Sequence, residues 1–450
     1  MESAKFAGLR QPPPDSGTSM YELVERLYPL CRSITGDGVR QTLQIVSQSI
    51  PLEIHEVPTG TPVYDWTIPR EWNIRDAYIA DSTGRRLVDF GRSSLHVVSY
   101  SVPVRARLSL QDLRPRLHVH PQHADWVPYR TSYYNESWGF CLSQNQLAEF
   151  RDEEYEVVID ASLEPGSLTY GEFVVPGAGP KEVLFFTHIC HPALCNDNLS
   201  GIAVLSHLAK CLVGTAPRYT YRFVFAPGTI GSIAWLARNE GRLDRIEHGL
   251  VVALVGDRGG FTYKRTRSGE ARIDKVVEHV LRHGRESWEV QAFSPYGYDE
   301  RQFGSPGLRL PVGRLTRTPN GAYPEYHSSA DDLALVTAEK LDASLATCLA
   351  IVSVLEGDQC LVNTSPNGEP QLGRRGLYRK VGGHHASDNR EMALLWVLNQ
   401  ADGSRTLLDI ADRAGLSFWD VAAAASDLWE CGLLKTHDGE RLRAAARGGA

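Results

Sequence analysis

Four residues whose side chains can bind a metal ion stand at or near the ends of apolar segments. His188 closes the segment EVLFFTH, and Asp197 lies just before a helix that begins near Ser200. Asp257 ends the segment VVALVGD, and His327 lies in the segment EYHSSADD. Imidazole nitrogen and carboxylate oxygen are common ligands of Zn²⁺ in proteins. These residue types therefore indicate a metal site.

Each of these residues also has an ordinary explanation when it is taken alone. A carboxylate after a strand usually caps a helix or a turn, and a lone histidine is more often a hydrogen-bonded core or surface residue. Their shared position at strand ends favours one site over four separate structural roles. Because they come from separate segments, only the fold can bring them together.

The segments that carry these residues alternate between strand and helix patterns. Apolar strand candidates span residues 182–188, 219–227 and 249–257, and helix candidates span residues 201–214, 231–239 and 341–357. This alternation is typical of a mostly parallel sheet covered by helices. Ligands bind such sheets beyond the carboxyl ends of the strands, which is where the four residues are expected.

The sequence pattern divides the chain into three domains. Residues 18–52, with two helix candidates joined by the turn TGDG, are expected to form one domain with the α/β segment at residues 171–370. Residues 53–170 consist of short aromatic and β-branched segments, which predict an inserted β-rich domain. Residues 371–450 contain three helix candidates and then LLKTHDGERLRAA, a two-strand ribbon around the turn HDGE. That pattern predicts a winged helix.

Composition narrows the class of protein. The 450 residues include 47 Lys and Arg against 54 Asp and Glu, a formal net charge of −7, which argues against a dedicated nucleic-acid or membrane surface. The helix candidate FWDVAAAASDLWECG is acidic, which argues against DNA recognition by the winged helix. The eight cysteines lack CxxC spacing, and no apolar run is long enough to span a membrane. We therefore expect a cytoplasmic protein with reduced thiols.

The order of motifs along the chain resembles that of the zinc aminopeptidases of the M28 type. The motifs are His188, DNLSG at 197–201, Gly231-Ser232, VGD ending at Asp257, YDERQF at 298–303, and YHSSAD around His327. More narrowly, the chain resembles a bacterial aminopeptidase-like family in which this domain carries a β-rich insertion and a C-terminal winged helix. The segments YDWTIPREWNIRDAYI, SYYNESWGFCL and RTPNGAYPEYHSSAD carry that narrower resemblance, which extends nearly from end to end.

The resemblance implies an α/β fold of the phosphorylase/hydrolase-like zinc aminopeptidase type, with the inserted β-rich domain and the winged helix. It also implies one or two Zn²⁺ ions, with His188, Asp197, Asp257 and His327 as metal ligands. Asp197 would be the carboxylate that can bridge two ions.

A second zinc site is conceivable beside the first, because Cys190 and Cys195 are close in sequence to His188 and His191. Thiolates and imidazoles together are common zinc ligands. The M28-like pattern uses no cysteine, however. We therefore interpret Cys190 and Cys195 as small packing residues.

The chain departs from the resemblance at the general base. In the M28 type a glutamate just before the Gly-Ser pair takes a proton from water, but here the segment reads APGTIGS and Gly228 stands in its place. Nearby carboxylates that could substitute are Asp299, Glu300 and Glu325. Glu300 is equally well explained as a salt-bridged neighbour of Arg301.

These observations lead to two hypotheses about function. The first is a zinc-dependent amide or peptide hydrolase that acts on a small or biosynthetic substrate, with Glu300 or Asp299 as the catalytic acid–base. Tyr298, Arg317 and Tyr326 are the candidate substrate-binding residues. The second is a catalytically silent binding or scaffolding protein that keeps the metal pocket. The sequence is compatible with a homo-oligomer. It predicts that the binding partner is a peptide or small-molecule substrate.

Overall fold

The computed structural model describes residues 10–377 and 389–436. The chain forms two compact units. The sheet unit comprises Pro12–Asp274 and Glu286–Ala346, and the winged-helix unit contains Lys275–Arg285 and the chain from Thr347 onward.

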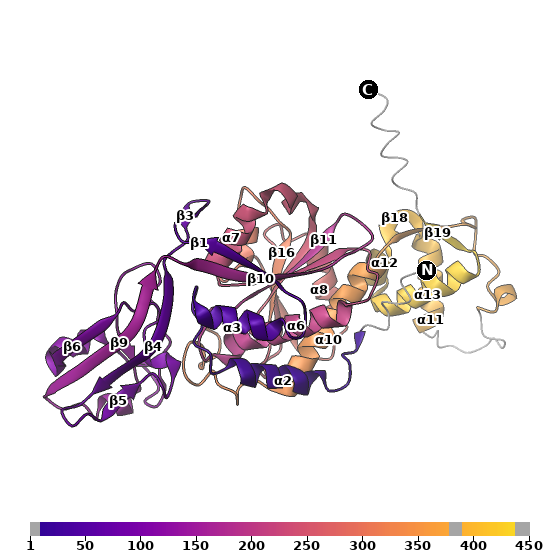
Figure 1. Ribbon diagram of the computed structural model, residues 1–450. Helices are drawn as coiled ribbons and strands as arrows, with labels where there is room; N and C mark the ends of the chain where they lie inside the picture. The colour runs from indigo at the N-terminus through magenta and orange to yellow at the C-terminus, as the bar shows by residue number, and fades with distance from the viewer. Residues whose placement is uncertain (1–9, 378–388, 437–450) are drawn as a thin grey trace. The chain divides into compact units, whose positions relative to one another are not determined.

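The sheet unit is built on an eight-stranded mixed sheet of order β1-β10-β12-β11-β13-β16-β14-β15 (Figure 1). Its strands are β1 (Glu53–Pro58), β10 (Ser167–Val175), β11 (Glu182–His188), β12 (Thr220–Ala226), β13 (Ile246–Val252), β14 (Phe261–Lys264), β15 (Trp288–Gln291) and β16 (Val312–Thr316). The four central strands β12, β11, β13 and β16 are parallel, so their carboxyl ends meet at one edge of the sheet. Every residue of β11 is buried, as expected for a strand covered on both faces.

Helices cover both faces of this sheet. The helices α2 (Ser16–Leu27), α3 (Asp37–Val46) and α6 (Ser200–Leu212) lie on one side, and α7 (Ile230–Arg238) lies on the other (Figure 1). In α2 the buried residues Met20, Leu23, Val24 and Leu27 recur at helical spacing, which turns one apolar stripe toward the core. These elements confirm the predicted α/β class.

The insertion forms a separate antiparallel sheet of order β5-β4-β9-β6. Its strands are β4 (Glu71–Ala80), β5 (Arg86–Asp89), β6 (Val104–Ser109) and β9 (Glu154–Glu164). The predicted insertion begins at residue 53, but β1 pairs with β10 in the central sheet, with Glu53 opposite Glu172. The inserted sheet is therefore entered and left through two neighbouring strands of the main sheet.

The winged-helix unit has the three predicted helices and a three-stranded sheet of order β18-β17-β19. The elements are β17 (Cys360–Asn363), α11 (Asn389–Gln400), β18 (Asp402–Thr406), α12 (Leu407–Ala414), α13 (Phe418–Glu430) and β19 (Leu434–Thr436). Thr406 caps α12 in a capping box with Asp409, and Gly415 ends that helix in the left-handed conformation. The winged-helix prediction is confirmed. Its sheet uses β17, which precedes residue 371, and the predicted ribbon strand after HDGE lies outside the described residues.

No helix within residues 10–377 and 389–436 is both long and apolar enough to cross a membrane.

Candidate metal centre

The loop between β11 and α6 is held tightly to the end of the sheet. It contains the irregular turn η4 (Cys195–Leu199), in which Asp197 and Asn198 have non-helical backbone angles. The Asn198 amide donates to the carbonyl of His188 at 2.9 Å, and its oxygen accepts from the Leu254 N–H at 3.0 Å. The side chain of Asn198 thus ties the loop to β11 and to the segment after β13.

A second carboxylate fixes the backbone of the same loop. The two carboxylate oxygens of Asp331 accept from the N–H groups of Asn196, at 2.5 Å, and of Asp197, at 3.0 Å. Ser200 adds a bond from its hydroxyl to the carbonyl of Asn196 at 2.7 Å. The side chain of Asp197 is therefore presented by a backbone that has little freedom to move.

Three histidines surround the buried carboxylate of Asp197. Nε2 of His188 lies 2.7 Å from Oδ1, and Nδ1 of His191 lies 3.6 Å from the same oxygen. Nε2 of His327 lies 3.0 Å from Oδ2, yet this buried nitrogen makes no hydrogen bond. One ligand atom from each of His188, His191 and Asp197 lies within 4.8 Å of the others. Such a set of nitrogen and oxygen donors suits a divalent metal such as zinc.

The insertion positions the third histidine. His327 has a φ of 55°, which is uncommon for residues other than glycine. Its carbonyl accepts from the Tyr129 N–H at 2.8 Å, and Ser329 donates to the carbonyl of Val127 at the same distance. The Tyr129 ring stands edge-on to the rings of His191 and His327, with centroids 5.3 and 5.1 Å away. Residues 127–129 of the insertion thus form one wall of the cluster.

Burial and charge together keep the cluster ready to bind a cation. Burial lowers the pKa of His191 to about 3, so its imidazole is neutral at physiological pH. Burial alone would raise the pKa of Asp197, but the electrostatic interaction with the His191 ring and the hydrogen bond from His188 hold it well below its usual range. A neutral imidazole and an ionised carboxylate are the protonation states that bind metal ions.

Gly228 lies directly beside the cluster. A Cβ atom placed there would lie 3.2 Å from Oδ2 of Asp299 and 3.2 Å from Cβ of His188. Ser232 donates to Oδ1 of Asp299 at 2.7 Å, whereas Oδ2 is buried and has no hydrogen-bond partner. Burial raises the pKa of Asp299 to about 6. Position 228 thus lies next to a buried carboxylate oxygen that has no hydrogen-bond partner.

The other two candidate carboxylates have different surroundings. Glu300 is fully buried and accepts from the Lys264 ammonium at 2.9 Å, with Arg314 3.6 Å away. This matches the salt-bridged alternative considered for Glu300, although the cation is not Arg301. The carbonyl of Glu325 accepts from the Ser328 hydroxyl in a turn, and among the described residues no hydrogen bond or ion pair joins its carboxylate to the cluster.

Asp257 does not join the three histidines in this structure. Oδ1 accepts from the Gly259 N–H at 2.6 Å and from the Thr318 hydroxyl at 2.7 Å. Oδ2 accepts from the Asn196 amide at 2.9 Å and from the Thr318 N–H at 3.2 Å. Four hydrogen bonds thus engage both oxygens, and the geometry gives Asp257 a structural role between loops.

Of the three predicted substrate-binding residues, Tyr298 and Tyr326 lie at the cluster and Arg317 does not. The hydroxyl of Tyr298 donates to Oδ2 of Asp197 at 3.2 Å and lies 2.9 Å from that of Tyr326. Tyr326 stacks on His327 with ring centroids 3.9 Å apart. Arg317 instead is fully buried and donates to the Gly259 carbonyl at 2.6 Å, so it holds loops together rather than facing the cluster.

The cysteines near His188 show no geometry for a thiolate site. Burial raises the pKa of Cys190 to about 12, and burial also raises that of Cys195. Cys190 donates weakly to the carbonyl of Gly228 at 3.6 Å. Protonated thiols are poor zinc ligands, which agrees with their interpretation as packing residues.

Three residues of this centre were not predicted from the sequence to be functional. His191 was considered only for a thiolate site, although its position three residues after His188 was a usable signal. Tyr129 lies in the aromatic segment WVPYRTSYY, which is equally typical of a β-rich core. Asp331 follows the YHSS segment, but its hydrogen bonds to residues 196 and 197 depend on the fold.

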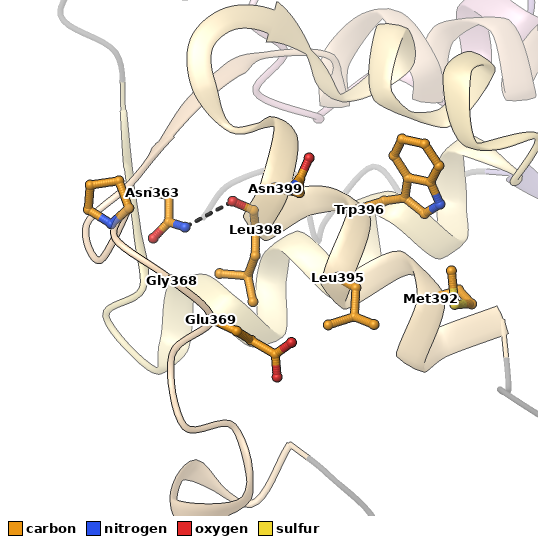
Figure 2. A pocket seen from close by; sticks show the side chains of 9 residues that line it. Asn363, Gly368, Glu369, Met392, Leu395, Trp396, Leu398 and Asn399 are labelled. Atoms are coloured by element: carbon orange, nitrogen blue, oxygen red, sulfur yellow. Dashed lines mark hydrogen bonds between the residues drawn. The ribbon is translucent and has the colours of Figure 1, made fainter.

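A separate cavity of about 520 Å³ lies in the winged-helix unit (Figure 2). Met392, Leu395 and Trp396 of α11 form its apolar side, and the Asn363 amide donates to the carbonyl of Leu398 at 2.9 Å. Its described lining residues include one carboxylate and no histidine or cysteine. We assign no chemistry to it.

Comparison with family models matches both units. A family described as a domain of unknown function, DUF4910, matches residues 21–358, and a winged helix-turn-helix family matches residues 359–436. A protein of Clostridium acetobutylicum named "Putative polysaccharide biosynthesis protein with aminopeptidase-like domain" is 50% identical over 421 residues, which are 94% of this chain and 97% of that protein.

Solved structures give the same relationship. A crystal structure described as a "putative peptidase" from Clostridium acetobutylicum has a TM-score of 0.90 at 49% identity and covers 94% of this chain and 97% of its own. A zinc aminopeptidase from Bacillus subtilis has a TM-score of 0.55 at 14% identity and covers 75% of this chain and 93% of its own. At 14% identity, the similarity to the Bacillus subtilis enzyme shows only that the two proteins share a fold.

Proposed function

Because the chain belongs to the DUF4910 family of aminopeptidase-like proteins with a C-terminal winged helix, we propose that it is a zinc-dependent hydrolase of a peptide or small amide. The observation that carries this proposal is the convergence of three imidazoles on the buried Asp197. Nε2 of His327 lies 3.0 Å from Oδ2 of that carboxylate without a hydrogen bond, and it is the atom that a bound cation would satisfy.

His188, Asp197 and His327 are the proposed ligands of the metal, and His191 completes a four-ligand set. Three nitrogens and one oxygen form a typical donor set for zinc. A bound zinc ion supplies a Lewis acid that polarises the amide carbonyl and promotes ionisation of water. Asp257 is left out of this set because hydrogen bonds already engage both its oxygens.

Asp299 is the proposed general base. Its free Oδ2 is next to Gly228 and His188, whereas Glu300 is paired with Lys264. In hydrolysis, Oδ2 would take a proton from the attacking water and return it to the leaving nitrogen as the C–N bond breaks. The hydrogen bond from Ser232 holds the other oxygen, so that Oδ2 keeps its direction.

Tyr298 and Tyr326 are proposed to orient the substrate. Their hydroxyls lie 2.9 Å apart, and that of Tyr298 reaches Asp197. Desolvation by burial raises the pKa of both tyrosines, so they remain hydrogen-bond donors at neutral pH. They can therefore donate to a carbonyl oxygen that gains negative charge.

The relative from Clostridium acetobutylicum is named for polysaccharide biosynthesis, which supports a biosynthetic substrate for this chain as well. Gly228 is the one feature that favours a silent binding protein, because it replaces the expected glutamate. The free oxygen of Asp299 beside it weighs against that alternative.

Metal analysis combined with an amide-hydrolysis assay tests the proposal. Wild-type protein is expected to hold near-stoichiometric zinc and to hydrolyse at least one amide of a broad panel. The double variant His188→Ala, Asp197→Ala should lose both properties. His55→Ala, a histidine stacked on Tyr170 in the β1–β10 pair, is the control and should keep both.

Two results would overturn the proposal. One is equally negligible metal in wild type and in the double variant after both are incubated with zinc. The other is fully metal-loaded wild type that hydrolyses nothing on the panel, which would leave the binding-protein hypothesis as the better account.

A further inference from the structure

The insertion contains a cavity of about 270 Å³ with several tyrosines in its wall. Tyr100, Tyr133 and Tyr134 line it together with apolar residues such as Ile68 and Pro69. We call it the tyrosine cavity. It lies within the sheet unit and is distinct from the cluster of histidines around Asp197.

A pair of tyrosines links this cavity to the metal centre. The hydroxyl of Tyr133 is hydrogen-bonded to that of Tyr129. The Tyr129 ring in turn stands edge-on to His191 and His327. The Tyr129–Tyr133 pair therefore joins the wall of the tyrosine cavity to the wall of the histidine cluster.

Two large aromatic side chains remain partly exposed beside the cavity, Tyr134 in its lining and Trp66 next to Tyr134. Trp66 is 43% exposed and Tyr134 is 48% exposed, and their ring centroids lie 5.2 Å apart. Trp66 belongs to the short ribbon of β2 (Pro62–Val63) and β3 (Trp66–Thr67), which leads directly into the cavity residues 67–70. Neighbouring aromatic rings left open to water are typical of a ligand-binding surface.

The polar groups of the cavity are uncharged or neutralised. Arg70 is paired with Glu136 and also donates to the carbonyl of Leu163 at 3.3 Å. The backbone N–H of Asn135 donates to the Ser132 carbonyl at 2.7 Å, whereas within the described residues the side-chain amide of Asn135 and the hydroxyl of Tyr134 make no hydrogen bond. The cavity thus offers aromatic faces together with free neutral donors and acceptors, and no unbalanced charge.

We propose that the tyrosine cavity binds a sugar ring, so that the substrate of the hydrolase is an amide carried on a sugar; this substrate assignment rests on the proposed function. The C–H face of a pyranose stacks on aromatic rings, and its hydroxyls need neutral hydrogen-bonding partners. Trp66 and Tyr134 supply the rings, and Asn135 supplies an amide. An aromatic amino-acid side chain would use the rings but leave that amide without a partner.

Ligand-observed saturation-transfer NMR on the full chain tests this proposal. The two probes are N-acetylglucosamine and N-acetylphenylalanine amide, which share an acetamide group and differ in the ring. The protein is first stripped of metal with a chelator, so that the histidine cluster contributes no metal-dependent binding. The sugar-ring protons are expected to receive saturation, and Trp66→Ala should weaken sugar binding about 5- to 10-fold.

A matched control separates this cavity from non-specific contacts with exposed tryptophan. Trp288 in β15 is 41% exposed, nearly as much as Trp66, and Trp288→Ala should bind the sugar like wild type. Tyr134→Ala should weaken binding as Trp66→Ala does. The proposal is overturned by undetectable sugar binding, by equal binding to Trp66→Ala and wild type, or by a preference for the phenylalanine probe.

The outcome can be distinguished from a failure of the proposed function. Binding is measured without metal and without turnover, so a chain that hydrolyses nothing can still show the sugar site. Conversely, a chain that hydrolyses peptides but shows no Trp66-dependent sugar binding keeps its proposed chemistry and loses only this substrate class.

Discussion

Replacing Asp299 by asparagine removes one negative oxygen while keeping the size of the side chain. The new side chain can still accept the hydrogen bond from Ser232, which lies 2.7 Å from Oδ1. Its amide would face the space beside Gly228, where Oδ2 has no partner. The change therefore abolishes proton transfer at this point without removing a bond that supports the fold.

The expected loss follows from that role. Removing a positioned acid–base group typically lowers the rate about 10²–10⁴-fold, which corresponds to about 2.7–5.4 kcal/mol of transition-state free energy. Zinc content should stay at the wild-type level, because Asp299 is not among the proposed ligands. The melting temperature should change little, since a buried carboxylate is replaced by a neutral group of the same shape.

The assay compares kcat/KM on the best amide of the panel at saturating zinc. Glu325→Gln, which changes a nearby carboxylate outside the cluster, is the control and should retain wild-type activity. Gly228→Glu in the Asp299→Asn background should recover part of the activity. Gly228 does not have a positive φ, so a side chain there meets no backbone strain of that kind. A Cβ atom at this position would require its neighbours to shift by only a few tenths of an ångström.

Asp299 is not the general base if Asp299→Asn keeps at least half of the wild-type kcat/KM with normal zinc content. A loss of zinc that matches the loss of activity would also contradict this role, because Asp299 would then support zinc binding and not proton transfer.

Two further predictions concern metal affinity and pH. Asp331→Asn should weaken zinc binding about 10-fold, measured against a chelating dye, because one of two loop N–H groups loses its acceptor; unchanged affinity would contradict the role given to Asp331. The hydrogen bonds from Arg40 lower the pKa of Glu71 from 4.5 to about 2, so this pair should stabilise the fold above pH 4.5 and lose that effect as pH falls toward 2. Glu71→Gln should therefore lower the free energy of unfolding by about 1–2 kcal/mol at pH 7, allowing for partial exposure of Arg40, and by much less at pH 2.5. Urea titrations at both pH values check this, and an equal difference at both would contradict it.

The arrangement of the fold was largely predictable because its signals are local. The segment EVLFFTH predicted a buried parallel strand, and β11 spans the same residues, Glu182–His188. The three C-terminal helices were likewise predicted as helix candidates, and α11, α12 and α13 are helical in the structure. The limits of the insertion were less visible, because β1 looks like the inserted strands in sequence and only its pairing with β10 assigns it to the central sheet.

Individual site residues were harder to predict, because side-chain direction is decided by distant contacts. Asp257 follows β13 at the expected edge, but Thr318 and Asn196 engage its carboxylate. Asp299 and Glu300 are adjacent in sequence, so no local pattern could choose between them. Lys264 binds the second and leaves the first beside Gly228.

Apolar periodicity and motif order are properties of short segments, so they already indicated which strands end at one edge and which residue types gather there. That His191 and Tyr129 join His188, Asp197 and His327 became visible in the folded chain alone. Those contacts bring together the insertion, the β11 loop and the loop around residue 327. They depend on long-range packing, which fixes where each side chain points and which no local pattern records.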